Sequence, residues 1–291
     1  MFWRHIEQVI AEKSAQPFKI LSRDSVGGGD ISQAYRLSGE HRKYFVKTNR
    51  KQLAFMFDAE ATALSEIHHT QTIKVPRPLT SGTFDQHSYL IMEWINFSGQ
   101  PNAQTFAHQL ADLHHCTRDQ FGFALDNTIG STPQVNNWSE HWVDFCTKQR
   151  LGYQLGLCKK NGLSHRLFDM GQLLQEKSSL LFETYQPKAS LLHGDLWSGN
   201  WAADEYGQPV IFDPASYYGD HEADLAMMEL FGHPGRQFFN AYDEFFAVDK
   251  GYSVRKNFYN LYHILNHANM FGGSYAMQAQ NMIEALLAEV R

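Results

Sequence analysis

The spacing of apolar residues changes along this chain, and the change predicts two regions of different structure. Apolar side chains recur at helical spacing over residues 3–14 and 53–69, which predicts a helix in each range. Short apolar runs of strand length lie before and after the second helix and are separated by turn residues. They are Phe18-Lys19-Ile20-Leu21, Ala34-Tyr35-Arg36-Leu37, Tyr44-Phe45-Val46, and residues 79–84 and 88–94. We therefore expect an antiparallel sheet that carries one main helix.

From residue 102 onward the apolar spacing is mostly helical. Helices are expected around residues 106–113, 142–146 and 167–174, and over 222–231, 234–246, 254–271 and 275–289. Residues 122–137 are rich in Gly, Asn, Thr and Pro, so we expect an exposed loop there. The predicted fold class is α+β, with a small sheet-rich N-terminal lobe (residues 1–94) and a larger, mostly helical C-terminal lobe (residues 95–291). A ligand is expected in a cleft between the lobes.

Composition limits the class of protein. Hydrophobic residues make up 43% of the 291 residues, which is enough for a substantial core. The net charge is −6 and no basic stripe is present, so we expect no nucleic-acid partner. The first residues lack the apolar core of a signal peptide, and no apolar run is long enough to span a bilayer. The three cysteines are far apart and form no Cys-x-x-Cys pair, which is typical of a reducing compartment. A cytoplasmic protein without membrane attachment is expected.

The strongest sign of chemistry is a polar segment that follows an apolar run. The segment is His193-Gly194-Asp195-Leu196-Trp197-Ser198-Gly199-Asn200, and Phe212-Asp213-Pro214 follows it. Phosphoryl transfer from ATP needs one carboxylate that orients the attacking hydroxyl, and an amide oxygen and a second carboxylate that hold Mg²⁺. Asp195, Asn200 and Asp213 supply that set at the spacing of a kinase catalytic loop. Asp-x-x-x-x-Asn alone also occurs in turns, but the flanking residues favour the catalytic interpretation.

A lysine and a glutamate of the N-terminal lobe are candidates for holding the nucleotide. Lys47 ends a strand that resembles the Val-Ala-Ile-Lys strand of kinases, from which a lysine reaches the α- and β-phosphates. Its partner is expected on the following helix, which offers Glu60 and Glu66. Glu60 shares a helix face with Leu64 and Ile67 and therefore points inward, so we assign the ion pair to Glu60. A solvated lysine and a surface glutamate are the alternatives.

Two further segments are candidates for nucleotide contacts. Gly27, Gly28 and Gly29 lie between the first two expected strands, where the lack of side chains lets backbone N–H groups approach a phosphate. An ordinary hairpin turn explains the same glycines equally well. The backbone of Glu93, Trp94 and Ile95, at the end of an apolar strand, is a candidate for hydrogen bonds to an adenine edge. A buried core strand is the alternative, and both interpretations can hold together.

Other polar groups are interpreted as structural. Two histidines at helical spacing lack a third metal ligand. A histidine pair lies near a helix end, where a capping or solvated role suffices. Three carboxylates open a helix, where they stabilise the helix dipole. These groups are His263 with His267, His114 with His115, and Asp220 with Glu222 and Asp224.

Together these segments resemble the fructosamine kinase (ketosamine-3-kinase) family, a branch of the aminoglycoside phosphotransferase-like enzymes with a protein-kinase-like fold. The resemblance extends from about residue 20 to residue 270. It is carried by residues 27–32, 44–49, 90–93, 193–201, 212–215, 217–220, 224–227 and 261–267. His-Gly-Asp-Leu-Trp-Ser-Gly-Asn-Trp with Phe-Asp-Pro-Ala is the most particular part. Asp30 departs from relatives that have a cysteine after the three glycines, so the redox switch of those relatives is not expected here.

The resemblance implies ATP-dependent phosphorylation of the 3-hydroxyl of a ketosamine, the sugar adduct that glycation leaves on an amine. Loss of the new phosphate then releases the amine, which amounts to deglycation. Asp195 is expected to orient the hydroxyl and accept its proton, and Asn200 and Asp213 to bind Mg²⁺. Trp197, beside Asp195, is the expected packing surface for the sugar, because a flat amphipathic ring suits its apolar face. A core tryptophan that braces the loop is the alternative.

Two other functions fit parts of the pattern. One is a kinase of the same fold that acts on an aminoglycoside, choline or a plain sugar. The other is a pseudokinase that binds nucleotide as a regulatory module, although Lys47, Asp195, Asn200 and Asp213 are all present. The expected partners are ATP and either a small glycated amine or a glycated protein lysine. The sequence leaves open fructose or ribose adducts, the oligomeric state, and any redox role of a cysteine.

Overall fold

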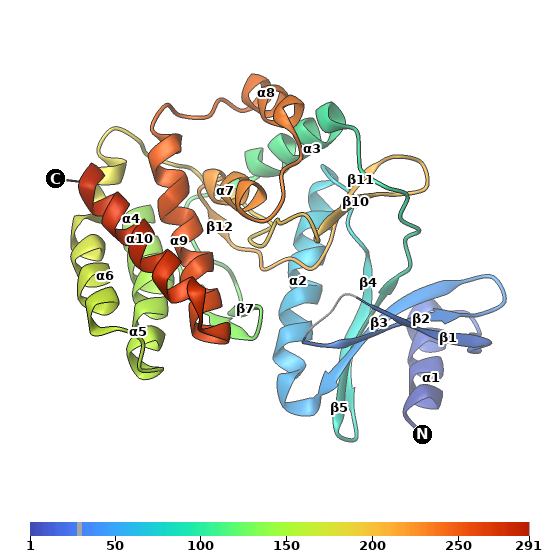
Figure 1. The fold of residues 1–291 in the computed structure, drawn as a ribbon. Helices are drawn as coiled ribbons and strands as arrows, with labels where there is room; N and C mark the ends of the chain where they lie inside the picture. Colours follow the sequence, from blue (N-terminus) through green and yellow to red (C-terminus); the bar gives the residue numbers. More distant parts are fainter. Residues whose placement is uncertain (28–30, 291) are drawn as a thin grey trace. The chain divides into compact units, whose positions relative to one another are not determined.

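The computed structural model describes residues 1–27 and 31–290, and the chain divides into two compact units (Figure 1). Unit 1 consists of Met1–Pro101 with Ala202–Pro214, and unit 2 of Asn102–Trp201 with Ala215–Arg291. Residues 95–101 and 202–214, which the sequence assigns to the helical lobe, pack with the sheet-rich unit. Backbone bonds join these segments to each other and to the rest of the unit: Ser98 N–H donates to Ala203 O at 2.8 Å, and Ile211 N–H donates to Lys74 O at 3.0 Å.

Unit 1 is built on an antiparallel sheet, as expected. In the described part it has five strands in the order β1-β2-β3-β5-β4. Their bounds are β1 Ser22–Val26, β2 Gln33–Ser38, β3 Lys43–Arg50, β4 Pro78–Phe84 and β5 His87–Glu93. The helices of this unit are α1 (Phe2–Ser14) and α2 (Ala54–Thr70), and a short 3-10 turn, Lys51–Leu53, precedes α2. A separate hairpin pairs β10 (Trp201–Ala203) with β11 (Pro209–Ile211).

Strand β3 shows why the sheet has two different faces. Its residues are alternately buried and partly exposed, because successive side chains of a strand point to opposite faces. Tyr44 and Val46 pack with Ile6 and Ile10 of α1 in one core cluster. Lys47 therefore points to the other face, away from α1.

The expected first strand, residues 18–21, is wrong. The strand begins at Ser22, and residues 17–20 run alongside α1 instead. The Ile20 N–H donates to Glu7 Oε1 at 2.7 Å rather than to the sheet, and Phe18 and Ile20 pack against the α1 cluster. Phe18 and Ile20 alternate with a polar residue because they pack on α1, and this packing gives the same apolar spacing as a strand.

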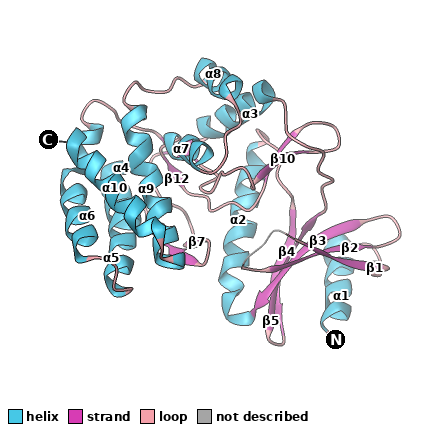
Figure 2. Cartoon of the chain, in the orientation of Figure 1, coloured by secondary structure: helices cyan, strands magenta, loops and turns pink. Residues whose placement is uncertain are grey.

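Unit 2 is mostly helical, as Figure 2 shows. Its helices are α3 Ala103–His115, α4 Trp142–Phe145, α5 Tyr153–Lys160, α6 His165–Lys177, α7 Glu222–Leu230, α8 Arg236–Phe245, α9 Tyr252–Phe271 and α10 Ser274–Glu289. A π-helical turn, Cys146–Gly152, joins α4 to α5, and a 3-10 turn, Ser178–Phe182, follows α6. A small sheet pairs β6 (Thr117–Arg118) and β12 (Tyr218–Gly219) with β9 (Ala189–Leu191).

The expected exposed loop over residues 122–137 is also wrong. It contains an antiparallel hairpin of β7 (Asn127–Ile129) and β8 (Thr132–Gln134), whose strand ends are buried. Gly130 has a φ of 62°, which suits the tight turn between the strands. The polar composition of this segment predicts solvent exposure, but Asn127 and Gln134 form hydrogen bonds inside the unit.

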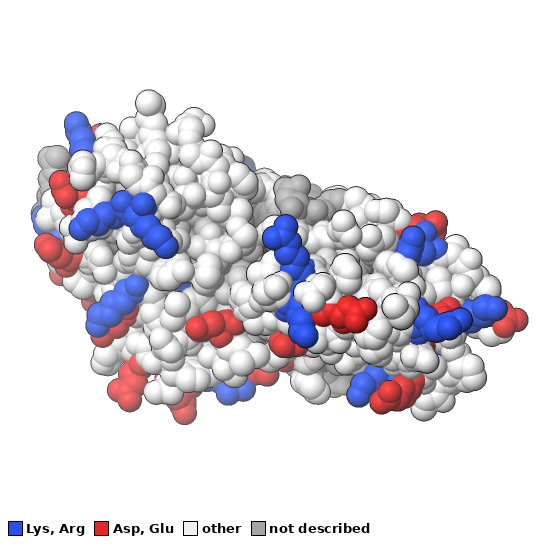
Figure 3. All heavy atoms as spheres, turned by 90° about the horizontal axis from the view of Figure 1, so that it is seen from below, with Lys and Arg blue, Asp and Glu red and all other residues white. Residues whose placement is uncertain are grey.

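Charged side chains of both signs lie on the face of the molecule that Figure 3 shows. On the face in Figure 3, basic and acidic side chains are interspersed among uncharged ones. None of the helices in the described residues is both long and apolar enough to span a membrane.

Candidate active site

Lys47 and Glu60 form the ion pair that the sequence predicts. Lys47 Nζ donates to Glu60 Oε1 at 2.8 Å, and both side chains are only 12% exposed. Leu64 and Ile67, on the same side of α2, are fully buried. The shared helix face therefore identified the correct glutamate.

The same ammonium group also contacts Asp213. Lys47 Nζ donates to Asp213 Oδ1, so one cation lies between two carboxylates. Burial disfavours the charged lysine, but the carboxylates of Asp213 and Glu60 outweigh it and raise the pKa of Lys47 above its ordinary value. Burial raises the pKa of Glu60 against the opposing charge of Lys47, and Asp213 adds to the rise. The cluster therefore has an excess of negative charge, which a second cation would relieve.

Asp213 follows the buried strand β11 and has an unusual backbone. Its φ is 58°, in the left-handed region, which costs an ordinary residue roughly 1–2 kcal/mol. The preceding Phe212 stacks on Phe97 with ring centroids 4.9 Å apart, and this contact anchors the strand end. The Asp213 side chain is 47% exposed. Backbone strain of this kind is concentrated at functional sites.

The glycine turn is described only in part. Gly28 and Gly29 lie outside the described residues. A Cβ atom on Gly27 would meet no atom within 4 Å, so its backbone borders open space. The phosphate contact of these glycines stays a prediction.

One backbone donor at the end of strand β5 is already hydrogen-bonded, and the expected adenine contacts of residues 93–95 stay a prediction. The Glu93 N–H donates to Arg77 O at 2.9 Å, so this donor is already used. Trp94 and Ile95 follow the strand and are partly buried. The Trp94 indole lies under the Arg36 guanidinium, 5.4 Å from the ring centroid. Its ring is therefore engaged with the sheet, and only backbone groups of this segment are candidates for adenine.

In unit 2, Asp195 and Asn200 are joined in one tight turn. Asn200 Nδ2 donates to Asp195 O at 2.8 Å and to Asp195 Oδ2 at 3.2 Å. Backbone bonds close the turn, from Trp197 N–H to Asp195 O and from Asn200 N–H to Trp197 O. Leu196 is fully buried and anchors the turn in the core. Asn200 therefore orients the carboxylate that is expected to meet the acceptor hydroxyl.

Asp224 holds the segment directly before Asp195, a role that the sequence interpretation missed. Its carboxylate accepts hydrogen bonds from His193 N–H at 2.7 Å and from Gly194 N–H at 2.8 Å. Burial disfavours its charge, but the bonds from His114 and these backbone groups lower its pKa below the ordinary value. Asp224 is thus an ionised, buried acceptor for the catalytic loop, whereas the sequence suggested only a helix-opening carboxylate.

His114 supports Asp224 and is fully buried, so the solvated or capping role expected for it is wrong. Its Nε2 lies 3.2 Å from Asp224 Oδ2, and its Nδ1 lies 2.6 Å from Tyr242 Oη. Tyr242 Oη also lies 3.0 Å from His221 Nδ1. Burial, with the nearby histidines, lowers the pKa of His221 to about 3, so this imidazole is neutral. A sequence cannot reveal this chain of contacts, because its members come from α3, α7 and α8.

Trp197 projects from the catalytic loop and is 40% exposed, which argues against a core brace. Gly199 makes this position possible, since a Cβ atom there would lie 2.3 Å from the Trp197 ring. The ring is therefore folded over its own loop with part of its surface open. Packing against a sugar stays a prediction.

The histidines of α9 have no metal-binding arrangement around them. Burial lowers the pKa of His263 to about 3 and also lowers that of His267, so both are neutral. Within residues 1–27 and 31–290, no three His, Cys, Asp or Glu side chains are grouped to hold a metal ion.

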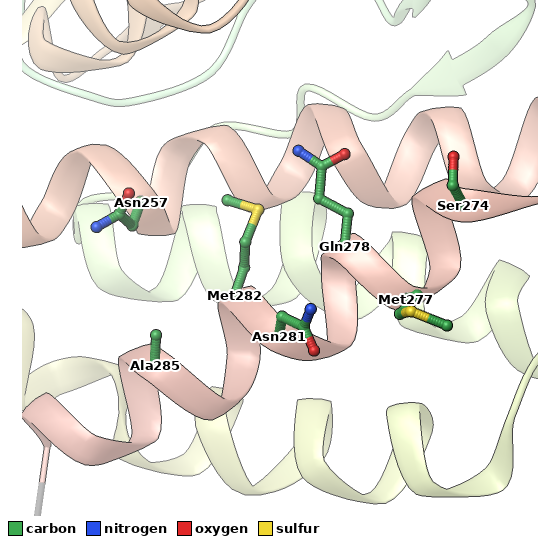
Figure 4. Close-up of a pocket in the computed structure, with 7 residues that line it drawn as sticks. All are labelled: Asn257, Ser274, Met277, Gln278, Asn281, Met282 and Ala285. Carbon is green, nitrogen blue, oxygen red and sulfur yellow. The ribbon is translucent and has the colours of Figure 1, made fainter.

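A large pocket in unit 2 lies apart from these residues. It has a volume of about 470 Å³ and runs between α9 and α10 (Figure 4). Its lining is uncharged and contains none of the predicted site residues: Asn257, Ser274, Met277, Gln278, Asn281, Met282 and Ala285.

The donor atoms of Asn200 and Asp213 fit Mg²⁺. The amide nitrogen of Asn200 is used on Asp195, which leaves its Oδ1 as the coordinating atom. The Asp213 carboxylate is half exposed and belongs to a cluster with excess negative charge. Mg²⁺ is usually held by one or two protein oxygens together with water and phosphate oxygens, rather than by a protein cage.

Comparison with known proteins identifies similar chains of nearly the same length. The family model described as Fructosamine kinase matches residues 2–289. A protein assigned as a ketoamine kinase in Synechocystis sp. is 47% identical over 289 residues, with 98% of this chain and 97% of that protein covered. The chloroplastic protein-ribulosamine 3-kinase of Arabidopsis thaliana is 42% identical, with 97% of this chain and 86% of that protein covered.

Solved structures agree with these matches. A protein assigned as a fructosamine-3-kinase from Haemophilus somnus has a TM-score of 0.87 at 31% identity, over 98% of this chain and 97% of that chain. An aminoglycoside phosphotransferase has a TM-score of 0.67 at 16% identity, over 99% of both chains, which shows the fold alone. The expected kinase-like fold class is therefore confirmed.

Proposed function

This chain belongs to the fructosamine kinase family, and we propose that it transfers the terminal phosphoryl group of ATP to the 3-hydroxyl of a ketosamine. Relatives named ketoamine kinase and protein-ribulosamine 3-kinase cover nearly the whole chain, so ATP-dependent kinase activity on a ketosamine follows from the family. The 3-position, the metal and the role of each residue are our proposal. The observation that carries it is the Lys47 ammonium group shared by Glu60 and Asp213.

Lys47 and Glu60 act on the nucleotide in this proposal. Glu60 holds Lys47 in place, and Lys47 binds phosphate oxygens. Asp213 and Asn200 would each offer an oxygen to Mg²⁺, which would neutralise charge on the phosphates. Lys47 has Glu60 as a second carboxylate partner and would direct its other N–H donors to phosphate oxygens. The glycine turn and the backbone of Trp94 and Ile95 complete the nucleotide contacts.

Asp195 acts on the acceptor. It orients the 3-hydroxyl of the ketosamine and accepts its proton as the oxygen attacks the terminal phosphorus. Asn200 and the backbone around it fix the carboxylate of Asp195, so the carboxylate has less rotational freedom to lose on reaching the transition state. Trp197 offers a flat ring to the apolar face of the sugar.

The chemistry of the product explains why phosphorylation leads to deglycation. Loss of a proton from C1 of the ketosamine 3-phosphate moves electrons into a C1–C2 enol. That enol expels phosphate from C3, and hydrolysis of the resulting imine returns the free amine. The enzyme need only transfer the phosphoryl group, and the later steps follow from the reactivity of the product.

The cytoplasm is the proposed location. All three cysteines are free, and burial raises the pKa of the Cys158 thiol to about 11. Burial also raises the pKa of the Cys146 thiol well above its ordinary value. Thiols in this state are inert, as expected for structural cysteines of a reducing compartment.

A substrate panel tests the proposal. The purified protein is incubated with ATP, Mg²⁺ and one of four acceptors: fructosyl-lysine, ribulosyl-lysine, free fructose or an aminoglycoside. We expect ADP and a 3-phosphate only with the two ketosamines, identified by ³¹P–¹H correlation in NMR. Phosphorylation of the free sugar or the aminoglycoside alone would show a different kinase of the same fold. Nucleotide binding without phosphorylation of any acceptor would show a pseudokinase.

A further inference from the structure

The buried hairpin β7–β8 binds the backbone beside the catalytic loop. Asn127 and Gln134 are 4% and 1% exposed, and burying an amide is costly unless it is hydrogen-bonded. Gln134 Nε2 donates to Ala215 O at 3.1 Å and to Asn127 Oδ1 at 2.7 Å. Asn127 Nδ2 donates to Ser216 O at 2.9 Å. We call these two side chains the amide clamp.

The orientation of the amide clamp is fixed by its partners. A backbone carbonyl only accepts hydrogen bonds, so the nitrogen of Gln134 must face Ala215. At the other end of the amide, Tyr262 Oη donates to Gln134 Oε1 at 2.8 Å. Tyr262 thus holds the amide in the orientation that binds Ala215. Burial raises the pKa of the Tyr262 hydroxyl, and the nearby Asp195 charge contributes, so the hydroxyl stays protonated as a donor.

The clamped carbonyl lies directly against the catalytic loop. Ala215 N–H donates to His193 O at 2.9 Å. Gly194 has a φ of 83°, and a Cβ atom there would lie only 2.2 Å from Ala215 O. The Ala215 peptide therefore contacts both residues that precede Asp195, and any shift of this peptide moves the loop.

Arg150 binds the two residues that follow strand β8 of the same hairpin. This buried guanidinium donates to Val135 O and to Asn136 Oδ1, both at 2.6 Å. It lies 4.3 Å from the centroid of Tyr217, the residue after Ser216. Arg150 belongs to the π-helical turn Cys146–Gly152, and such turns are frequent at functional sites. The hairpin and the segment that it binds are thus held together at a second point.

We propose that Gln134, oriented by Tyr262, is a positioning residue for Asp195. It acts by fixing the Ala215 peptide, against which the His193–Gly194 backbone rests. This inference rests on the proposed role of Asp195. A small displacement of a catalytic group lowers the rate of transfer strongly while leaving ground-state nucleotide contacts intact. Loss of the amide clamp therefore lowers kcat and leaves KM for ATP unchanged.

Three variants test the proposal in the full-length protein. Gln134→Met keeps the size of the side chain and removes its donors and acceptor. We expect kcat with fructosyl-lysine to fall roughly 10- to 100-fold, with KM for ATP within about twofold. Tyr262→Phe removes only the hydroxyl and should lower kcat roughly 3- to 10-fold. In the double variant kcat should match that of Gln134→Met, because the hydroxyl acts through Gln134.

Ser178→Ala is the control. Ser178 is fully buried in unit 2, and its hydroxyl donates to Leu174 O of α6 at 2.7 Å, away from the amide clamp. We expect a lower urea midpoint of unfolding and a kcat within about twofold of the unchanged protein.

Two results would overturn the proposal. One is a normal kcat in Gln134→Met with the same stability loss as the control. The other is a normal kcat in Tyr262→Phe, which decides the matter even where Gln134→Met does not fold. Asp195→Ala, measured alongside, separates this failure from that of the proposed function. If it stays active, the role of Asp195 itself is wrong.

Discussion

Replacing Asp224 with Asn should damage the catalytic loop and the stability of unit 2 together. In the native arrangement one carboxylate oxygen accepts from Gly194 N–H, and the other accepts from His193 N–H and His114 Nε2. An asparagine has one oxygen and one NH₂ group. Whichever way it is turned, its NH₂ group meets an N–H group that needs an acceptor.

The magnitude follows from these contacts. One hydrogen bond to a charged acceptor is lost, worth roughly 1.5–3 kcal/mol, and the buried N–H group left without an acceptor costs about 1–3 kcal/mol. The free energy of unfolding should therefore fall by about 3–5 kcal/mol, a large part of the roughly 5–15 kcal/mol that is typical of native proteins. It corresponds to a fall in Tm of roughly 6–20 °C for a unit of this size. Because the orphaned group precedes Asp195, kcat should fall about 100-fold.

The assay combines thermal unfolding by circular dichroism with ADP release at 20 °C, where the variant stays folded. Asp204→Asn is a close control, because Asp204 is also buried and accepts from two backbone N–H groups and a cation, Lys74. Both N–H groups share Asp204 Oδ1 and Lys74 faces Oδ2, so an asparagine keeps the backbone bonds and loses only the contact with Lys74. We therefore expect a smaller loss of stability than in Asp224→Asn, with kcat nearly unchanged. A stable Asp224→Asn variant would refute the bonding scheme. Normal turnover in a destabilised variant would refute the link to Asp195.

Three further predictions concern other parts of the chain. Glu60→Gln should lower kcat/KM for ATP about 10- to 100-fold, since Lys47 then keeps only Asp213 as a charged partner. Glu66→Gln is the control, and equal effects of the two variants would contradict the assignment of Glu60. Burial lowers the pKa of His263 to about 3, below its ordinary 6.5, so the stability due to its neutral form is complete above pH 6.5 and is lost as the pH falls toward 3. The free energy of unfolding in urea should drop by roughly 2 kcal/mol between pH 6.5 and 5, and a constant value would exclude this effect. Gly194→Ala should abolish turnover, because its Cβ atom would lie 2.2 Å from the backbone oxygen of Ala215. Gly162→Ala, at φ 70° with no atom within 4 Å of the added Cβ, should lower the free energy of unfolding by only about 1–2 kcal/mol and leave turnover intact. Similar losses in both variants would show that the close contact is unimportant.

The sequence predicted most of the fold and the ion pair between Lys47 and Glu60 in unit 1. Helical spacing identified α2 and, through Leu64 and Ile67, the inward glutamate Glu60. The resemblance of residues 44–47 to a kinase strand identified Lys47, and its ion pair with Glu60 is present. These predictions succeeded because each depends on residues that are close in sequence and follow one period.

What failed depends on contacts between distant segments. Residues 18–21 have a strand pattern, but Ile20 bonds to Glu7 on a helix. The polar residues of 122–137 predicted solvent exposure, whereas Gln134 meets Ala215, distant in sequence. The support of Asp224 by His114 was missed for the same reason. One signal was available: in Ile129-Gly130-Ser131-Thr132 a Gly-Ser pair lies between two β-branched residues, which favours a hairpin.

The most direct test of the central claim is turnover of Asp195→Ala with a ketosamine. ADP formation and the ketosamine phosphate are measured with ATP, Mg²⁺ and fructosyl-lysine, and nucleotide affinity is measured separately by fluorescence. We expect turnover to be abolished while ATP still binds with nearly unchanged affinity, because Asp195 serves the transfer step rather than ground-state binding. Near-normal formation of the phosphate by this variant would contradict the claim.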